Sequence, residues 1–238
     1  MSQKLSKKTK VSEVISIVAH QLKNPISVLK GYLEALISED FGRLNQKQKE
    51  YLSDSLENIK RMIEIVSNLL DVSKIESGKY EMKPATVDLK KIAGQVINDF
   101  SLWIQASNCE IALKTAARKD FLAKADPLKI RQVIENLISN AIKYKSKGRS
   151  KIVIFLKKIN KKIIFSCQDN GIGIPKEDFK NVFTKFYRSE KALEVDPNGS
   201  GLGLYIDKAI INLSGGKIWF KRNKDHGTTF YFTLPLAR

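Results

Sequence analysis

One short segment of the sequence contains four polar residues at close intervals: Asn136, Asn140, Lys143 and Tyr144. At steps of four, three and one they fall on one side of a helix, because successive helical residues are rotated by about 100°. Amide oxygens are suitable hard ligands for Mg²⁺, and a nearby lysine can neutralise phosphate charge. A solvated polar face is the plainer alternative, but two asparagines are poor helix formers in mid-helix. The segment therefore predicts a metal and phosphate site.

A glycine-rich run, from Asp169 to Ile174, follows an apolar segment that ends at Gln168. Its two glycines, Gly171 and Gly173, allow the backbone to approach a flat or phosphorylated ligand. Asp169 offers a buried hydrogen-bond acceptor for an exocyclic amine. A plain turn explains a lone Gly-X-Gly as well, so this run needs support from its neighbours in the sequence.

A second glycine run, from Gly199 to Leu204, precedes a segment with helical periodicity. The amides of such a run and the N-terminus of the following helix can hold phosphate oxygens. The glycine spacing also invites a dinucleotide-binding interpretation. That interpretation fails, because no strand leads directly into the run and no acidic residue follows at the end of a next strand.

The best candidate for an acceptor of a transferred group is His20. Helical rotation puts it about 200° from Val18 and from Leu22, hence away from the apolar stripe and on the solvent face. Asn24 lies one turn later on the same face, and Pro25 should bend the helix locally. An ordinary exposed histidine near a kink is the plainer alternative. An exposed neutral imidazole is nonetheless a competent nucleophile near neutral pH.

Two long amphipathic helices are expected to position this histidine. Apolar residues recur at steps of three or four over 11–38 and again over 46–77, each time as a single stripe. A short loop containing Gly42 joins the two segments into an antiparallel hairpin. A lone hairpin leaves apolar surface exposed, so we expect two copies to pair into a dimeric four-helix bundle.

The remainder of the chain has a mixed α and β pattern, and we expect an α+β protein overall. Gly78 ends the second helix and Pro84 marks a linker, which gives a basic tail over 1–10, a hairpin domain over 11–80 and a second domain over 81–238. Helices are predicted over 89–107, 126–144 and 201–214, with Asp126 as an N-cap. Strands are predicted over 110–113, 121–123, 152–156, 162–168, 217–221 and 228–234. The irregular alternation favours an α/β sandwich.

Composition narrows the class of protein. With 42% hydrophobic and 28% charged residues, the chain has the balance of a soluble globular protein. No apolar stretch approaches the roughly 20 residues that a membrane span needs, and we expect a cytoplasmic location. Cys109 and Cys167 are expected to be reduced, buried thiols. The net charge of +17 suggests a nucleic-acid ligand, but aromatic residues do not interleave with the lysines, so we expect no nucleic acid.

In order and spacing these segments resemble the boxes of two-component sensor histidine kinases. His20 to Pro25 resembles their H box, and Asn136 to Tyr144 the N box. Asp169 to Ile174 and Gly199 to Leu204 are similar to the first and second glycine boxes. Phe183 to Arg188 resembles the F box, and Gly227 to Phe230 a short third glycine box. The resemblance covers about 11–234, and six boxes in the right order make coincidence very improbable.

The resemblance implies a dimerisation and phosphotransfer hairpin followed by a Bergerat-type (GHKL) ATP-binding sandwich. It implies in-line transfer of the γ-phosphoryl group of ATP to His20, then to an aspartate of a response regulator. Asn140 would bind Mg²⁺, Asp169 the adenine amine, and 186–200 would form a mobile lid. The residues expected to bind the nucleotide are Asn136, Asn140, Lys143, Tyr144, Asp169, Gly171, Gly173, Lys185, Arg188, Gly199, Gly201, Leu202, Gly203 and Thr228.

One position departs from the family pattern. The family usually has Glu or Asp directly after the phospho-accepting histidine, and this chain has Gln21. An amide cannot act as a general base near neutral pH, although it can orient the imidazole ring. We therefore expect slower autophosphorylation. Asn24 matches the position that the family uses to orient water when it removes phosphate from its partner, so phosphatase activity is plausible.

Three alternatives remain open at the level of sequence. An ATP hydrolase like type II topoisomerases or MutL would have a water-activating Glu where this chain has Asn136, and would leave His20 without a role. A dimeric scaffold that binds nucleotide and a response regulator but transfers phosphate poorly is favoured by Gln21. A nucleic-acid-binding module is suggested by the charge alone, and it leaves the glycine boxes unexplained.

Overall fold

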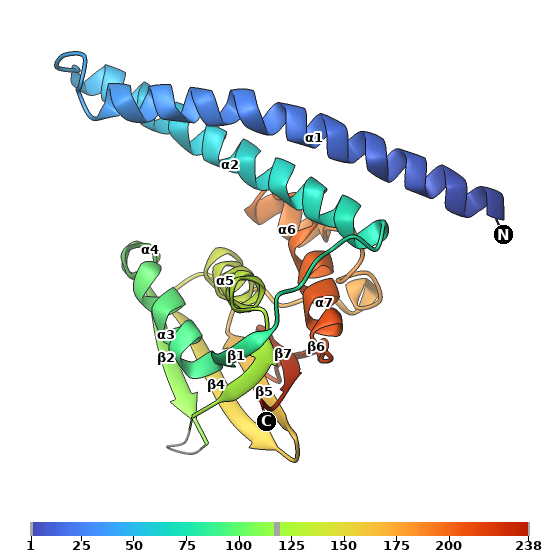
Figure 1. Ribbon diagram of the computed structural model, residues 1–238. Helices are drawn as coiled ribbons and strands as arrows, with labels where there is room; N and C mark the ends of the chain where they lie inside the picture. The colour runs from blue at the N-terminus through green and yellow to red at the C-terminus, as the bar shows by residue number, and fades with distance from the viewer. Residues whose placement is uncertain (1, 117–119, 238) are drawn as a thin grey trace. The chain divides into compact units, whose positions relative to one another are not determined.

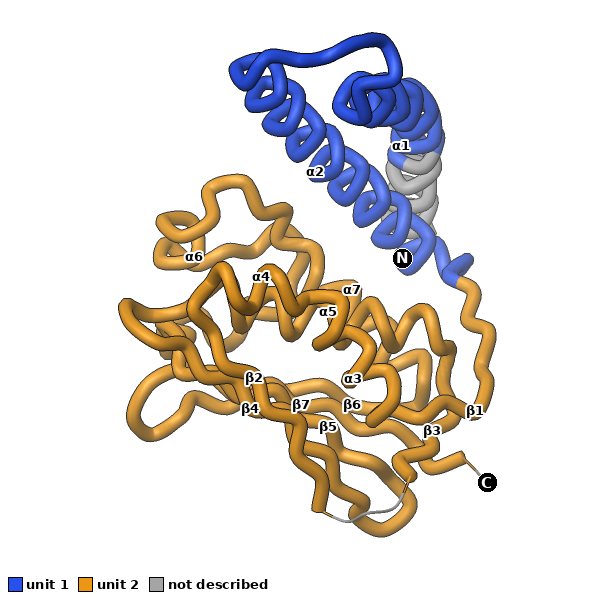
Figure 2. The backbone as a smooth tube through the Cα atoms, turned by 90° about the vertical axis from the view of Figure 1, so that its left-hand side faces the viewer, with its two compact units in different colours: residues 1–80 blue, residues 81–238 orange. Residues whose placement is uncertain are grey.

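The computed structural model describes residues 2–116 and 120–237, and for residues 2–13 and 16 the backbone alone. The chain divides into two compact units, Met1–Tyr80 and Glu81–Arg238, which Figure 2 shows in different colours. Within the described residues, no helix combines the length and the apolar character that crossing a membrane would require.

The first unit is a hairpin of two long helices, α1 (Ser2–Ile37) and α2 (Gln46–Glu76). Helix α1 begins at Ser2, so the backbone of the basic N-terminal residues continues the helix that periodicity predicts only from residue 11, and it runs through Pro25. Helix α2 begins with a reciprocal capping box. The Asn45 side chain accepts from the Gln48 N–H at 2.9 Å, and the Gln48 side chain accepts from the Asn45 N–H at 2.9 Å.

The hairpin buries only a narrow stripe. Ala19 and Ile26 of α1 pack with Val66 of α2, supported by the half-buried side chains Ile59, Ile63, Leu69 and Leu70. Other apolar side chains of α1 are between 37% and 60% exposed in this single chain, namely Val14, Ile17, Val18, Leu22, Val28, Leu29 and Leu36. An isolated hairpin therefore leaves a second apolar face of α1 uncovered.

The second unit is a two-layer α/β sandwich. Its five-stranded sheet has the order β2-β4-β5-β7-β6, with β2 parallel to β4 and the other neighbours antiparallel. Figures 1 and 2 show α3, α5 and α7 on one face of this sheet. The strands are β2 (Cys109–Thr115), β4 (Ser150–Ile159), β5 (Lys162–Asp169), β6 (Lys217–Arg222) and β7 (Thr228–Pro235). A separate antiparallel pair joins β1 (Ala85–Asp88) to β3 (Leu122–Ala125).

The helices of this unit are α3 (Leu89–Asp99), α4 (Ser101–Ala106), α5 (Pro127–Lys143), α6 (Glu190–Val195) and α7 (Gly203–Leu213), with a 3₁₀ turn over Lys176–Asp178. The sequence predicts one helix over 89–107, whereas the structure breaks it at Phe100, where ψ is 5°. Strand β1 and helix α6 are additions to the prediction, and both are short. Pattern-based arguments are weakest for elements of four to six residues.

The core lies between the helical layer and the sheet. The rings of Phe165 on β5 and Phe232 on β7 stack with centroids 4.6 Å apart. Above them, α5 buries an apolar face. This face consists of Ile130, Val133, Ile134, Leu137, Ile138, Ala141 and Ile142. Because α5 is held so completely on one side, the polar residues on its other side have a fixed position.

Candidate functional site

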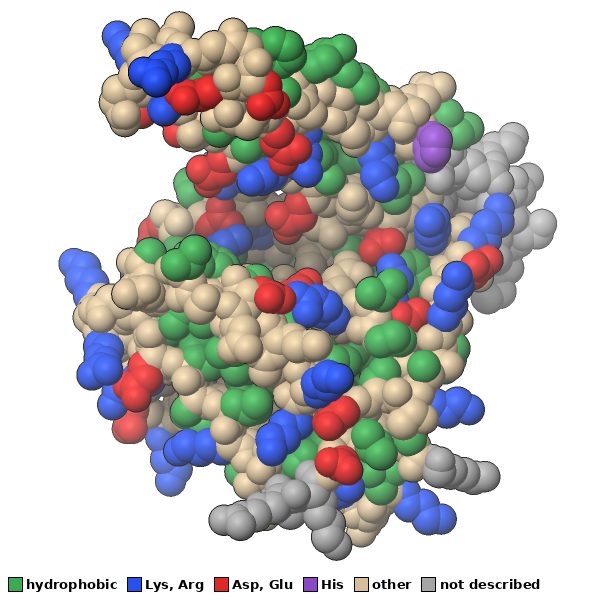
Figure 3. Space-filling model, turned by 60° about the vertical axis from the view of Figure 1, so that its left-hand side comes forward, with side chains coloured by type: hydrophobic (Ala, Val, Ile, Leu, Met, Phe, Trp, Pro, Cys, Tyr) green, Lys and Arg blue, Asp and Glu red, His purple; other side chains and the backbone are tan. Residues whose placement is uncertain are grey.

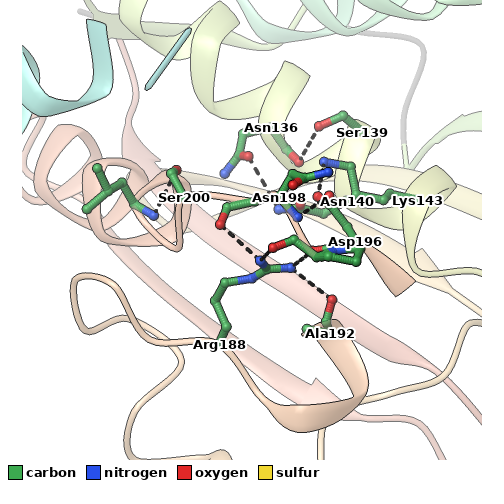
Figure 4. Close-up of polar contacts among 12 residues, drawn as sticks. Asn136, Ser139, Asn140, Lys143, Arg188, Ala192, Asp196, Asn198 and Ser200 are labelled. Atoms are coloured by element: carbon green, nitrogen blue, oxygen red, sulfur yellow. Dashed lines mark hydrogen bonds and ion pairs between the residues drawn. The ribbon is translucent and has the colours of Figure 1, made fainter. Parts of the chain in front are cut away.

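Helix α5 carries the first group of predicted site residues. Its start is fixed by Asp126, whose Oδ1 accepts from the N–H groups of Leu128 and Lys129 at 3.0 and 3.2 Å. Its other carboxylate oxygen accepts from the Lys83 N–H at 2.8 Å, which ties the incoming chain to the same point. Figure 4 shows Asn136, Asn140 and Lys143 close to the segment that contains Arg188, Asp196 and Asn198.

The two asparagines form a short chain of hydrogen bonds. Asn140 Nδ2 donates to Asn136 Oδ1 at 3.4 Å, and Asn136 Nδ2 donates to Asp207 Oδ2 at 2.6 Å. Both asparagines are half-buried. Amide oxygens held in this way suit a hard divalent cation such as Mg²⁺. The donor set thus fits the metal that the sequence predicts.

Sequence reasoning missed Asp207. It lies on α7 with an exposed fraction of 1%, and Asn136 is its hydrogen-bond partner. Burial strongly raises the pKa of this carboxyl group, and the bond from Asn136 only partly offsets that effect. The available signal was an acidic residue within a helix whose neighbours are Ile206, Ala209 and Ile210.

Lys143 has an acidic partner in the segment after α6. Its Nζ lies 2.9 Å from Asp196 Oδ2, and the side chains are 38% and 11% exposed. Partial burial raises the pKa of Asp196, but bonds from Lys143 and from the Asn198 N–H outweigh it, and the pKa falls below its usual value. The ammonium group that would face a phosphate is therefore paired with a carboxylate of the same chain.

Arg188 organises the segment that follows it. Its Nη1 donates to the carbonyls of Pro197 and Gly199, both at 3.0 Å, and its Nη2 to that of Ala192 at 2.9 Å and to that of Asp196. Figure 4 shows this fan of bonds. In this structure the guanidinium thus binds carbonyls of 192–199. The exposed Lys185 lies three residues earlier, and a phosphate-binding role for either residue stays a prediction.

The first glycine run forms a tight loop around Asp169, the last residue of β5. Asp169 Oδ1 accepts from the N–H groups of Gly171 at 2.8 Å and Thr228 at 3.1 Å. Burial of the carboxyl group raises its pKa despite these bonds. A side chain at Gly171 would collide with the Tyr144 carbonyl, which itself accepts from the Ile172 N–H at 3.0 Å. The loop therefore joins β5, the C-terminal end of α5 and the start of β7.

A second contact to this loop comes from a residue that the sequence did not indicate. Asn223 Nδ2 donates to the Asp169 carbonyl at 2.7 Å, and Asn223 Oδ1 accepts from Thr229 Oγ1 at 2.6 Å. Gly173 and Gly227 both have positive φ, 69° and 86°, and the Cβ of a larger residue at 173 would lie 3.5 Å from the Gly227 carbonyl oxygen. An asparagine before a glycine turn was the only sequence signal for Asn223.

The second glycine run lies between Arg188 and α7. Gly201 has a φ of 66°, and its carbonyl accepts from the Phe186 N–H at 2.9 Å. Leu202 is buried and precedes α7 without providing a side-chain cap, so the first amides of α7 have no side-chain acceptor from that position. Gly203 allows α7 to approach α5, since a Cβ there would lie 2.7 Å from Asn136 Oδ1.

The predicted acceptor lies in the first unit. His20, Gln21 and Asn24 are all exposed on α1, and the neighbouring Ala19 is 2% exposed. His20 is thus exposed, as the sequence predicts, although Val18 and Leu22 of the predicted apolar stripe are themselves 48% and 46% exposed in this single chain. Figure 3 shows one face of the molecule, on which Lys and Arg side chains are spread among Asp and Glu over the second unit. This face presents no continuous basic stripe.

Two family models match the chain. A His Kinase A (phospho-acceptor) domain matches residues 10–78, and a histidine kinase-, DNA gyrase B- and HSP90-like ATPase matches residues 125–238. Sensor histidine kinase WalK of Bacillus subtilis (strain 168) is 34% identical over 226 residues, which cover 94% of this chain and 36% of WalK. WalK of Staphylococcus aureus is 30% identical over 225 residues, 94% of this chain and 53% of that protein. The chain thus spans between a third and about half of these relatives.

Solved structures agree with the fold. Full-length ShkA in complex with AMPPNP has a TM-score of 0.75 at 23% identity, and covers 94% of this chain and 46% of ShkA. Histidine kinase ThkA in complex with the response regulator protein TrrA has a TM-score of 0.66 at 25% identity, covering 99% of this chain and 65% of ThkA. The helical hairpin, the α/β sandwich and the two matched domains together show that this chain belongs to the two-component histidine kinases, whose catalytic core it resembles in both parts.

Proposed function

We propose that this chain autophosphorylates on a histidine and then phosphorylates a response regulator. The γ-phosphoryl group of ATP would pass to a ring nitrogen of His20, with ADP as the leaving group and the imidazole proton released to the medium. An aspartate oxygen of the regulator would then take the phosphoryl group and leave the histidine neutral. The observation that carries this proposal is that one chain has an exposed histidine in a phospho-acceptor domain and a nucleotide-type site in its second unit.

The second unit supplies the parts that ATP requires. Asp169 has a second carboxylate oxygen available beside the one that accepts from Gly171 and Thr228, and it would accept from the adenine amine. Asn140, supported by Asn136, would hold Mg²⁺, which neutralises phosphate charge when bound. Lys143 would exchange its bond to Asp196 for a phosphate oxygen. Such a site acts mainly by positioning and electrostatics, because phosphoryl transfer needs little covalent help from the protein.

Two macromolecular partners follow from this proposal. The uncovered apolar face of α1, which includes Val18, Leu22 and Leu29, supports a homodimer in which two hairpins form a four-helix bundle. ThkA, which is 25% identical, has been solved with a response regulator, and this likeness supports a receiver domain as the second partner. Both ATP and receiver domains are found in the cytoplasm, where we place the chain.

The direct test is incubation with γ-labelled ATP and Mg²⁺. The native chain should gain an acid-labile label, and His20→Ala and Asn140→Ala should gain none. His20→Ala should still bind ADP, since the histidine lies in a different unit from the nucleotide site. Label that persists in His20→Ala would contradict the assignment of the acceptor. Nucleotide binding without any label on the native chain would favour the scaffold alternative that Gln21 suggests.

The first prediction concerns Gln21, which is exposed beside His20. Gln21→Glu should raise the initial rate of autophosphorylation by about 10²-fold, because a carboxylate can take the imidazole proton and an amide cannot. The rate should be measured with saturating MgATP, so that binding does not limit it. Gln21→Ala is the matched control and should be no faster than the native chain. An unchanged rate in Gln21→Glu would show that a general base at position 21 does not accelerate the transfer.

A further inference from the structure

The side chain of Asp207 makes a contact that the proposed kinase chemistry does not by itself require. It lies on α7, four residues after Gly203, so that both residues face α5. Asp207 Oδ2 accepts from Asn136 Nδ2 at 2.6 Å. A Cβ at position 203 would lie 2.7 Å from Asn136 Oδ1 and 2.8 Å from its Nδ2. One turn of α7 therefore encloses the Asn136 amide from two sides.

This contact determines which end of the Asn136 amide faces the rest of the site. A carboxyl oxygen accepts from the amide NH₂ whether the carboxyl group is ionised or neutral. With its nitrogen held by Asp207, Asn136 presents its oxygen to Asn140, whose Nδ2 donates to it at 3.4 Å. The two ends of an amide point apart, so the Asn140 oxygen is directed away from Asn136. The direction of hydrogen bonding thus runs from Asn140 through Asn136 to Asp207.

The burial of Asp207 and its contact with Asn136 point to orientation of that amide as the role of its carboxyl group. It is 1% exposed, and among the described residues its side chain has Asn136 as its one hydrogen-bond partner, so its burial costs more free energy than burial of an apolar residue of that size. Burial raises its pKa, which is the signature of that cost. A buried polar group with a single, specifically placed partner is a means of orientation more than of stability.

We propose that Asp207 is a positioning residue for the metal-binding amides, a role that deepens the proposed kinase function and rests on it. Without this carboxyl group the Asn136 amide is free to turn and present its NH₂ to Asn140. An NH₂ group cannot ligate a cation, and it would repel the metal that the oxygen attracts. Partners that orient metal ligands typically contribute about 10-fold or more to metal affinity.

The test is a comparison of ADP affinity in Mg²⁺ and in EDTA by isothermal titration calorimetry. In Asp207→Ala the gain in affinity on adding Mg²⁺ should fall by about tenfold, while the affinity in EDTA stays within about twofold of the native value. Asp207→Asn, whose amide oxygen can accept the same bond, should retain most of the gain. Equal losses in Mg²⁺ and EDTA would show a merely structural role and overturn the proposal.

A double-mutant cycle separates action through Asn136 from any other effect. In an Asn136→Ala background, Asp207→Ala should cause no further loss of the Mg²⁺ gain, whereas additive losses would overturn the proposal. Removal of a buried carboxyl group with one partner should leave the fold intact, and Asp207→Ser provides a second variant. Ile210→Val, buried on the same helix, controls for loosening of α7. If the native chain itself shows no Mg²⁺ gain, the proposed function fails as well. If the native chain shows the gain and Asp207→Ala keeps it in full, this inference alone fails.

Discussion

At the scale of single residues, Asp169 is held in a conformation that favours binding over stability. Asp169 is half-buried, and both backbone donors use the same oxygen of its carboxyl group, Oδ1. Asp169→Asn should keep these two bonds through its amide oxygen and remove the cost of burying a charge. We predict that this variant unfolds at an equal or higher temperature at neutral pH, while its affinity for ATP falls by at least about tenfold. The loss arises because an NH₂ group would then face the adenine amine, donor against donor.

The pH dependence of stability gives an independent check on Asp169. Its pKa is raised in the folded state, so the folded chain holds a proton more tightly than the unfolded chain, and native stability falls as the pH rises through that window. The advantage of Asp169→Asn should therefore be present above the folded pKa and shrink as the pH is lowered. Denaturation by urea at several pH values measures it. An advantage that grows on acidification would contradict the raised pKa.

The ion pair between Lys143 and Asp196 leads to a third prediction. Asp196→Asn keeps the size of the side chain and an oxygen for the Asn198 N–H, but it releases the Lys143 ammonium. The pair lies at the surface, with the Lys143 side chain 38% exposed, and a solvent-screened pair is worth about 1 kcal/mol, so ATP should bind about threefold to fivefold more tightly. Equilibrium binding at low ionic strength is the measurement.

Two controls accompany the Asp196 variant. Glu194→Gln removes the same charge from the same exposed segment and should leave the affinity for ATP within about 1.5-fold, since screened charges contribute little. In a Lys143→Met background Asp196→Asn should have no effect. An equal gain in both backgrounds would mean that Asp196 acts on ATP by its charge alone, not by occupying Lys143.

At the scale of elements, the position of α5 depends on its N-cap. Asp126 is 6% exposed and accepts three backbone hydrogen bonds, two from α5 and one from Lys83. We predict that Asp126→Ala lowers the free energy of unfolding by about 2 kcal/mol, the upper end for a cap, because the hydrogen bond from the Lys83 N–H is lost together with the two from α5. Asp88→Ala removes the cap of α3, which has a single bond, and should cost about 1 kcal/mol. Urea denaturation of the two variants, followed by circular dichroism, compares them. Equal costs would show that the two additional bonds of Asp126, from Lys129 and Lys83, contribute nothing.

The elements that the sequence predicted well are those with long periodic patterns or strong caps. Helices α1, α2, α5 and α7 and the strands of the main sheet follow from apolar spacing, and Asp126 with Pro127 marks the start of α5 to the residue. The break at Phe100 could not be predicted, because no glycine or proline stands there. Helix α6 lies in a polar segment whose order comes from Arg188, and contacts of that kind leave no local pattern.

The residues of the candidate site likewise fall into those that the sequence predicts and those that it does not. Residues with a recognisable spacing, such as Asn136, Asn140 and Asp169, were found from the sequence, and the structure brings the first two into one hydrogen-bonded chain. Asp207 and Asn223 were missed, since each acts through a partner that is 71 or 54 residues away along the chain. Sequence spacing reports on neighbours along one helix, whereas these contacts depend on how α7 and the turn before β7 pack in three dimensions.

At the scale of the whole molecule, the uneven burial of α1 argues for association. Ala19 and Ile26 are 2% and 4% exposed against α2, whereas Leu29 and Leu36, one heptad apart, are 50% and 37% exposed. Apolar residues repeated at this interval on a helix are typical of a packed bundle. We predict that the native chain is a dimer at micromolar concentration and that Leu29→Glu with Leu36→Glu yields a monomer, because four carboxylates would have to be buried in the interface.

Sedimentation velocity distinguishes these states, and the second unit provides an internal standard. Its core does not include the hairpin residues, so the double variant should bind ADP as the native chain does. Lys60→Glu, an exposed charge change on α2, is the control and should remain dimeric. A double variant that stays dimeric would place the interface on another face of the hairpin. A monomer that retains ADP binding but gains no label on His20 would mean that phosphoryl transfer requires the paired bundle, and hence that dimerisation is part of the catalytic arrangement and not only of its stability.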